Sequence, residues 1–252
     1  MNATALIATL DLPPNTRVER RVPKTLLLKN AAPTAADKRL INDGIEDMLW
    51  VATLKPANIG VPAFDDDLRA YVEIAVLRVT VRAGAHAERL ATLIHRAVPH
   101  PVLLIVADGT AVTLSLAHQR LAQGKADARV LDDAPVAATL NDAGPGAQPS
   151  EFIAALSLAR QPRADLYQLY QGWTDTVVAA LAAAVTGRFS LPASPEQAAR
   201  RRAALGEWHR LDAEGARLRA AARNEKQIAR RVALNLALAD ADAARKRALA
   251  DL

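Results

Sequence analysis

The chain has 252 residues, of which 51% are hydrophobic and 23% are charged, and its formal net charge is +5. This composition is too apolar for a disordered chain, and the length suits one large domain or one domain with an appendage. The chain contains no cysteine, which excludes disulfides and thiolate metal sites and agrees with a cytoplasmic location.

The N-terminal part of the chain predicts helices and strands in alternation. Residues 3–12 are expected to form a short helix or strand. The stretch from Thr34 to Trp50 predicts a helix, because Thr34 can cap its start and apolar residues recur at helical spacing. Residues 50–55 then suit a strand, and residues 57–67 are expected to form a connection.

The most strongly predicted strand covers residues 70–82. It is rich in β-branched residues, and apolar side chains fall on both of its faces, so we expect it to be buried on both sides. Residues 85–98 follow with the apolar spacing of an amphipathic helix. The strands before and after this helix can therefore be parallel neighbours in the sheet.

Further strands are expected after this helix. The apolar run 102–107 suits a central strand, and Asp108-Gly109 predicts a tight hairpin turn into residues 111–117. Residues 130–131 and 136–140 are expected to add short strands, before a linker that spans residues 144–149.

The remainder of the chain predicts helices only. Residues 150–159 and 164–186 have helical patterns, and Gly187 is placed to end the second of them as a left-handed cap. Ser194 followed by Pro195 is typical of a helix start.

The order of these elements predicts an α+β fold with a mixed or antiparallel sheet and flanking helices, followed by an all-helical C-terminal part that ends in a coiled-coil-like helix or hairpin. We expect three parts: an α+β body at 1–148, a helical part packed on the body at 149–193, and a basic helical extension at 194–252.

The extension carries the excess charge of the protein. Residues 196–252 contain thirteen Arg and Lys against eight Asp and Glu, and this excess of five equals the net charge of the whole chain. Its apolar residues follow a heptad spacing that Glu225 and Lys246 interrupt, which indicates helix pairing, within the chain or with another chain. The predicted assembly seam consists of Trp208, Leu211, Leu218, Val232 and Leu236.

The same extension presents candidates for nucleic-acid contact. Six arginines there can meet phosphates, although acidic residues lie between them, so a solvated helix face is the more ordinary interpretation. These candidates are Arg200, Arg201, Arg202, Arg223, Arg230 and Arg231.

Signals for catalysis are sparse. No phosphate-binding loop or nucleophile motif is present, and the five histidines lack metal-ligand spacing, so we expect no catalytic residue, metal or cofactor. The alternative is a degenerate metal-dependent nuclease, in which Glu73 acts with Asp65 and Asp67. That site needs a lysine nearby, and Lys55 or Lys125 would have to be brought in by the fold. A structural glutamate, either facing an edge or paired with Arg78, is the simpler interpretation.

Several stretches resemble a bacterial family of unknown function, the DUF4391 family. They are Val22-Pro23-Lys24, Trp50 to Ile59, Tyr71 to Ile74, Ile94 to Leu103, and Glu225-Lys226-Gln227 with Val232 to Asn235. The resemblance implies a companion of helicases and DNA methyltransferases in defence or restriction-type gene clusters. It implies no catalytic residues.

These observations favour a non-enzymatic accessory or assembly subunit of a bacterial DNA-processing system, acting through its C-terminal helices. We expect a homodimer, or a complex with a helicase or DNA methyltransferase, with no membrane contact. Two alternatives stay open: the nuclease centred on Glu73, and a non-specific DNA-binding protein that uses the arginine-rich tail.

Overall fold

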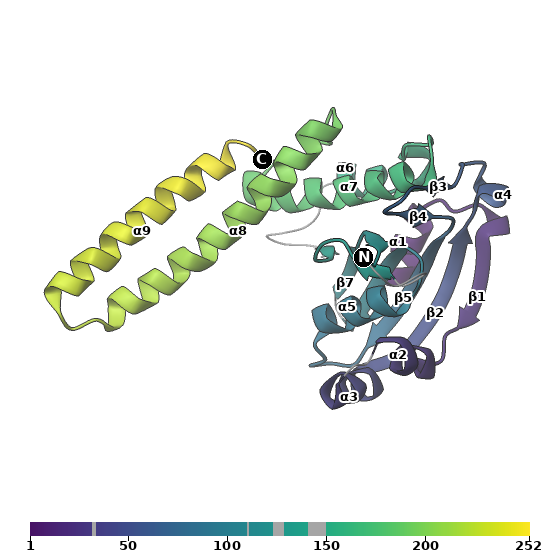
Figure 1. Cartoon of the computed structure of the whole chain (residues 1–252), viewed down its shortest axis with the longest axis horizontal. Helices are drawn as coiled ribbons and strands as arrows, with labels where there is room; N and C mark the ends of the chain where they lie inside the picture. Colours follow the sequence, from purple (N-terminus) through teal and green to yellow (C-terminus); the bar gives the residue numbers. More distant parts are fainter. Residues whose placement is uncertain (32–33, 110, 123–128, 141–149) are drawn as a thin grey trace. The chain divides into compact units, whose positions relative to one another are not determined.

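The computed structural model describes residues 1–31, 34–109, 111–122, 129–140 and 150–252. The chain forms two compact units, Met1–Val177 and Val178–Leu252 (Figure 1). The predicted linker at 144–149 and the end of the predicted body at residue 148 lie outside the described residues, and the predicted division into three parts stays a prediction.

A six-stranded sheet organises the first unit, in the order β1-β2-β5-β6-β7-β10. Its strands are β1 (Arg17–Arg21), β2 (Ile45–Leu54), β5 (Ile74–Val81), β6 (Val102–Asp108), β7 (Ala111–Leu116) and β10 (Val136–Leu140). Only the pair β5–β6 is parallel among these neighbours; the other pairs are antiparallel. The sheet is therefore mixed, and the α+β class predicted from the sequence is confirmed.

Two small hairpin sheets accompany the large one. They are formed by β3 (Phe64–Asp65) with β4 (Ala70–Tyr71), and by β8 (Gln119–Leu121) with β9 (Arg129–Leu131). The predicted turn at Asp108-Gly109 joins β6 to β7, and Gly109 has a φ of 63°, a conformation that glycine adopts without strain.

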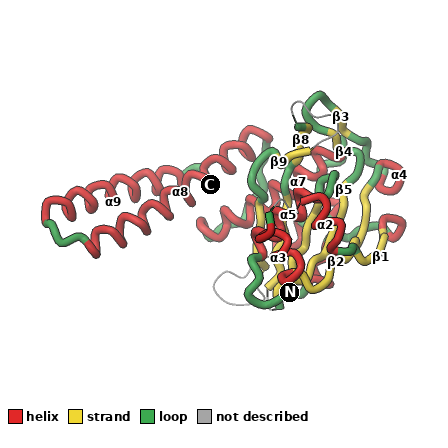
Figure 2. Tube along the Cα trace, turned by 60° about the horizontal axis from the view of Figure 1, so that its bottom comes forward, coloured by secondary structure: helices red, strands yellow, loops and turns green. Residues whose placement is uncertain are grey.

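Helices accompany the sheet in the first unit. They are α1 (Ala3–Thr9), α2 (Lys24–Ala31), α3 (Ala35–Gly44), α4 (Pro56–Ile59), α5 (Ala87–Ala97), α6 (Ser150–Ala155) and the first part of α7 (Leu166–Thr186). Figure 2 shows α2, α3 and α5 together over one side of the strands. Leu27, Ile41 and Leu93 from these three helices join one buried core with Leu77 and Leu104 of the sheet.

The central strands are buried on both faces, as predicted. Leu77 and Val79 of β5 belong to the core beneath α2, α3 and α5, while Ile74 and Val76, which alternate with them, are fully buried on the opposite face. Such continuous burial explains why β5 and β6 have almost no polar positions.

The helix predicted from Thr34 to Trp50 is too long. Thr34 caps α3 as expected, because its Oγ1 accepts the N–H of Asp37, but α3 ends at Gly44. From Ile45 the chain is extended and forms β2, which pairs with β1 on one side and β5 on the other. Apolar spacing at 45–49 fits a helix as well as a strand, and the pairing on both sides favours the strand.

The strand predicted at 70–82 is interrupted. Ala70 and Tyr71 form β4 and pair with β3, whereas β5 begins only at Ile74. Val72 is 43% exposed, and together with Glu73 it separates the two strands. Glu73 therefore lies immediately before β5, at the end of the central strands, and not within a strand.

The second unit is mainly a helical hairpin. Helix α8 (Pro195–Asn224) packs on α9 (Ile228–Leu249), and Glu225–Gln227 separate them, as Figure 1 shows. The helix start at Ser194 is confirmed, because its side chain accepts the N–H of Gln197. Of the two arrangements open from the sequence, one long helix or a hairpin, the chain adopts the hairpin.

Candidate functional site

The strand ends around Glu73 bring together three residues that we call the Glu73 cluster. Nζ of Lys55 lies 2.8 Å from Oε2 of Glu73, and Nε2 of His100 lies 3.2 Å from Oε1. Lys55 follows β2, Glu73 precedes β5 and His100 precedes β6. Because β2 is antiparallel and β6 parallel to β5, these three positions meet at one edge of the sheet.

The electrostatics of the cluster favour a neutral imidazole. Burial lowers the pKa of His100 below its usual value, Glu73 opposes this change, and the cations Arg129 and Lys55 lower the pKa further. A neutral His100 can donate its Nε2–H to Glu73, which leaves Nδ1 unprotonated, and this buried Nδ1 has no hydrogen-bond partner among the described residues. The arrangement holds the carboxylate of Glu73 through both of its oxygens.

The structure does not place Asp65 and Asp67 in the Glu73 cluster. Both are exposed, Asp65 in β3 and Asp67 in the turn that follows. Asp66, between them, accepts the backbone N–H groups of Leu68 and Arg69 and so caps the turn. Within the described part of the chain, no group of three or more His, Asp or Glu side chains is placed to hold a metal ion.

Of the two lysines considered for the nuclease alternative, Lys55 lies beside Glu73, and Lys125 lies outside the described residues. Arg78, considered from the sequence as a partner of Glu73, pairs with Asp47 instead. Glu73 is thus a paired glutamate, with different partners from the one expected.

A buried aromatic cluster near the same sheet edge was missed from the sequence. The hydroxyl of Tyr71 lies 2.5 Å from Nδ1 of His118, and the rings of Tyr167 and Tyr170 pack on both residues. Burial raises the pKa of Tyr71 far above its usual value, so the phenol stays protonated and donates to His118. Thr174 of α7 also reaches this cluster, since its Oγ1 lies 3.4 Å from Nε2 of His118. The helical spacing of Tyr167, Tyr170 and Thr174 was the available signal.

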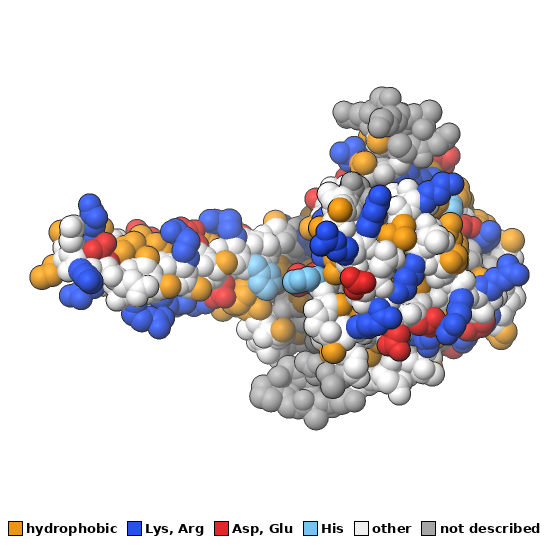
Figure 3. Space-filling model, turned by 90° about the horizontal axis from the view of Figure 1, so that it is seen from below, with side chains coloured by type: hydrophobic (Ala, Val, Ile, Leu, Met, Phe, Trp, Pro, Cys, Tyr) orange, Lys and Arg blue, Asp and Glu red, His pale blue; other side chains and the backbone are white. Residues whose placement is uncertain are grey.

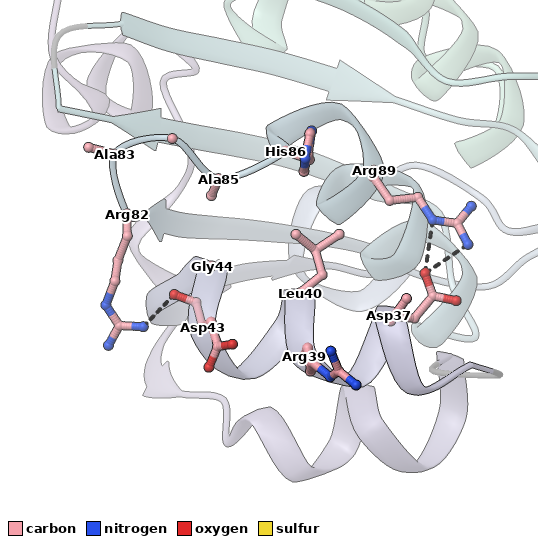
Figure 4. A pocket seen from close by; sticks show the side chains of 12 residues that line it. Asp37, Arg39, Leu40, Asp43, Gly44, Arg82, Ala83, Ala85, His86 and Arg89 are labelled. Carbon is pink, nitrogen blue, oxygen red and sulfur yellow. Dashed lines mark hydrogen bonds and ion pairs between the residues drawn. The ribbon is translucent and has the colours of Figure 1, made fainter.

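A pocket of about 600 Å³ lies between α3 and the segment that joins β5 to α5 (Figure 4). Two of the arginines that line it, Arg82 and Arg89, are engaged by the protein itself, while Arg39 is exposed. Arg89 binds Asp37 through two nitrogens, at 2.8 and 3.0 Å, while Arg82 donates to the carbonyls of Asn42, Asp43 and Ile45 at the end of α3. Hydrogen bonds from Thr34 and Arg89 lower the pKa of Asp37. These contacts tie α3 to β5 and α5.

The predicted assembly seam divides between two faces of the hairpin. Leu211 and Leu218 of α8 are each 5% exposed, and Trp208 is half-buried. Val232 and Leu236 of α9 are instead 52% and 64% exposed. The first group serves the packing of the hairpin, whereas the second lies on its surface.

The packing between α8 and α9 uses a different face of α9. Arg219 pairs with Asp242 at 3.1 Å, and Arg245 pairs with Asp212 and lies over the ring of Trp208. Ala241, on the same side of α9, is buried. At about 100° per residue, Val232 lies about 180° around the helix from Ala241. Val232 therefore points away from α8.

We define the outer face of α9 by the apolar residues that lie around this direction. All of them are exposed: Ile228, Ala229, Val232, Leu236, Ala239 and Ala243. Figure 3 shows hydrophobic side chains lying among Lys and Arg along the hairpin. Helix α9 thus has an apolar stripe on each of two opposite sides, and only one of them packs on α8.

The arginine candidates for nucleic-acid contact also differ in their surroundings. Arg201 is 5% exposed and donates to the carbonyl and the hydroxyl of Ser190, so it is not placed to meet a phosphate. Arg202 is half-buried. The remaining candidates are exposed: Arg200, Arg223, Arg230 and Arg231.

These features define an α+β protein with a mixed six-stranded sheet, whose C-terminal unit is a helical hairpin with an apolar outer face. Comparison with known families identifies it further: the family described as "Domain of unknown function (DUF4391)" matches residues 10–244, and the chain belongs to that family. No curated protein and no solved structure matches it. In the ranges that the structure describes, no helix has both the length and the apolar composition needed to cross a membrane.

Proposed function

We propose that this protein is a non-enzymatic assembly subunit of a bacterial DNA-processing complex, of the anti-phage defence or restriction type, and that it binds its partner through α8 and α9. The observation that supports the proposal is the outer face of α9. Ile228, Val232 and Leu236 are 71%, 52% and 64% exposed and follow one another at intervals of four residues.

Such a face is costly to leave in water. Full burial of a Val, Leu or Ile side chain contributes about 1.5–3 kcal/mol relative to exposure. A helix that only had to complete a hairpin would need one apolar side, and α9 has two. A partner surface that covers Val232 and Leu236 accounts for the second side.

The charges near the hairpin turn support a partner of acidic character. Arg223, Lys226, Arg230 and Arg231 are all exposed and surround the turn, with Glu225 as the acidic residue among them. Acidic protein surfaces and nucleic-acid phosphates are both attracted by such a cluster. The DNA-processing setting itself rests on what the family resemblance implies.

The test is affinity purification from the native host with quantitative mass spectrometry. We compare the wild type with the double variant Val232→Asp/Leu236→Asp. The wild type should recover a helicase, a DNA methyltransferase or another DNA-processing protein, and the double variant should recover it at least tenfold less.

Leu68→Asp is the matched control, because Leu68 is an aliphatic residue of the first unit with 54% exposure. This control should recover the partner like the wild type. Equal recovery by all three proteins, or no DNA-processing partner at all, would contradict the proposal.

The basic turn also favours a second candidate function, direct DNA binding through the tail. The exposed Arg223, Arg230 and Arg231 can neutralise phosphates without reading sequence. Its test is a salt titration of the affinity for DNA.

A further inference from the structure

We infer that Ser190 is a phosphorylation site, and that the buried guanidinium of Arg201 binds the phosphate group that Ser190 carries. Both residues belong to the second unit. The inference does not depend on the proposed assembly role, because it concerns the segment that leads into α8 and not the outer face of α9. It is supported by the burial of Arg201, by a donor edge of its guanidinium that is half occupied, and by the charge of the surrounding segment.

Arg201 is a buried cation without an acidic partner. It is 5% exposed, and in the described part of the chain its guanidinium donates only to the carbonyl and the hydroxyl of Ser190. Arg69 and Arg78, whose Nε atoms are likewise buried without a hydrogen bond, are each paired with an aspartate. Because a buried charge is costly unless an opposite charge accompanies it, Arg201 is placed to receive an anion.

The donor edge of Arg201 formed by Nε and Nη2 is half occupied. Nη2 lies 3.1 Å from Oγ of Ser190, whereas Nε is buried and has no hydrogen-bond partner among the described residues. In Arg210 the same edge binds both oxygens of the Glu207 carboxylate, each at 2.8 Å. An oxyanion at the position of the Ser190 hydroxyl can therefore satisfy both donors, since a guanidinium and a phosphate match in geometry.

A phosphate on Ser190 is an anion that can reach this edge. Arg201 is too buried to meet a phosphate of nucleic acid, but Ser190 beside it is exposed and lies in the segment between α7 and α8, outside both helices. Phosphorylation of Oγ attaches three acceptor oxygens directly beside the hydroxyl position. One of them can stay with Nη2 while another accepts the N–H of Nε.

The charge around Ser190 favours a doubly negative group. Residues 188–202 contain four arginines and one acidic residue, Glu196. One of these arginines, Arg188, precedes Ser190 by two residues and is exposed. A phosphoserine carries about 1.5 to 2 negative charges at pH 7, so it would offset cations that this segment otherwise leaves unbalanced.

The modification requires a protein kinase and a nucleoside triphosphate. The hydroxyl oxygen of Ser190 attacks the γ-phosphorus, and the bond from Oγ to phosphorus forms as the bond from phosphorus to the bridging oxygen breaks. A nucleoside diphosphate leaves, and the hydroxyl proton passes to a base of the kinase.

The phosphate would strengthen a connection that the chain already makes. Ala193 donates its N–H to Oε1 of Gln197, and Ser194 caps α8, so the segment before α8 lies against the first turn of the helix. The contact between Arg201 and Ser190 extends this attachment to the second turn. Phosphorylation would therefore fix the direction in which the chain enters α8.

The first experiment maps phosphorylation on the full chain purified from its native host. Trypsin cleaves after Arg188 and Arg200 and so gives one peptide that contains Ser190 and Ser194, which tandem mass spectrometry distinguishes. Phosphate should be found on Ser190 and not on Ser194, whose Oγ is engaged as the cap of α8. A peptide that is unmodified in both growing and stationary cultures, or phosphate on Ser194 alone, would overturn the inference.

The second experiment measures whether Arg201 binds the phosphate. Phosphoserine is incorporated at position 190 during translation, and phosphorus-31 NMR follows its second ionisation, which has a pKa of about 6 without a partner. A guanidinium in contact should lower this pKa by about one unit or more. Arg201→Gln should return the pKa to about 6, whereas Arg200→Gln, at the exposed neighbouring arginine, should leave it lowered. A phosphoserine that titrates at about 6 or above in the otherwise wild-type chain would contradict the contact, whether or not Arg201→Gln folds.

Inorganic phosphate distinguishes a modification from a free ligand. It is added to the unmodified full chain, and thermal unfolding is measured by circular dichroism. The melting temperature should not rise, because the buried Arg201 is reached through Ser190. A rise that Arg201→Gln abolishes, together with an unmodified Ser190 in the native protein, would assign the site to a free anion and overturn the proposed modification.

Discussion

His95 is the buried titratable residue with the clearest consequence for stability. It is fully buried, and its Nε2 lies 3.0 Å from Oγ of Ser115. Burial lowers the pKa of His95 from 6.5 to about 3. The folded protein therefore keeps this imidazole neutral at pH values at which the unfolded chain already binds a proton.

The sign of the pH effect follows from this difference. Well above pH 6.5 the imidazole is neutral in both the folded and the unfolded state, so the free energy of unfolding is at its full value. As the pH falls from 6.5 towards 3, the unfolded state gains the proton and the folded state does not, so the free energy of unfolding decreases. We expect a loss of about 2 kcal/mol between pH 7.5 and pH 5, measured by urea unfolding.

Two variants isolate the contribution of His95. His95→Gln keeps a group able to bond Ser115 but does not titrate, so most of the pH dependence should disappear. His209→Gln, at an exposed histidine of α8, should keep it. A pH dependence that is the same in all three proteins would assign the effect to other groups.

Two glycines that lie within helices should respond in opposite directions to replacement by alanine. A Cβ on Gly172 of α7 would lie 2.4 Å from Cδ of Pro162 and 2.8 Å from Oε1 of Gln161, so the helix and the preceding segment are in close contact there. A Cβ on Gly206 of α8 would meet nothing within 4 Å.

Gly172→Ala should therefore lower the free energy of unfolding by about 1–3 kcal/mol, because the clash outweighs the gain in helix propensity. Gly206→Ala should raise the stability of its helix by about 0.5–1 kcal/mol, since only the propensity changes. Thermal unfolding followed by circular dichroism measures both. Stabilisation by Gly172→Ala would contradict the prediction, because it would mean that Pro162 can move away from the new methyl group at little energetic cost.

The elements also show what sequence reasoning can and cannot predict. Helix caps at Thr34 and Ser194, the turn at Asp108-Gly109 and the buried strand β6 were predictable, because each depends on neighbouring residues. The start of β2 at Ile45 was not, since pairing with β1 and β5 decides it.

The dependence on pairing between distant segments also explains why the partners of Glu73 could not be predicted from the sequence. Glu73 could be singled out as a charge in an apolar stretch, but Lys55 and His100 reach it through the order of strands in the sheet. Similarly, the contact between Tyr71 and His118 joins residues 47 positions apart in the chain. Spacing along the sequence carries no signal for such contacts.

At the scale of the whole molecule, direct DNA binding makes a quantitative prediction. If the exposed arginines of the basic turn neutralise phosphates, the DNA affinity of the full chain should fall steeply with salt. Replacing Arg223, Arg230 and Arg231 together by Ala should reduce the slope of log K against log salt by about 2.7, or about 0.9 for each lost phosphate contact. Fluorescence anisotropy on duplex DNA measures the slope.

A control with the same loss of charge separates local contact from net charge. Lys29, Lys38 and Arg39 are exposed cations of the first unit, and replacing them together by Ala should leave the slope unchanged. Equal reductions in both triple variants would indicate a diffuse electrostatic effect and contradict a DNA site at the turn.

The order of strands in the sheet has a consequence for how the protein is made. Across the six-stranded sheet the strands follow the order in which they occur in the chain, from β1 to β10, with only the short hairpin strands left out. Each strand therefore pairs with one that precedes or follows it closely, which keeps the contact order low and favours rapid folding. During synthesis on the ribosome, β1 and β2 can associate first and each later strand can add to an existing edge as it emerges.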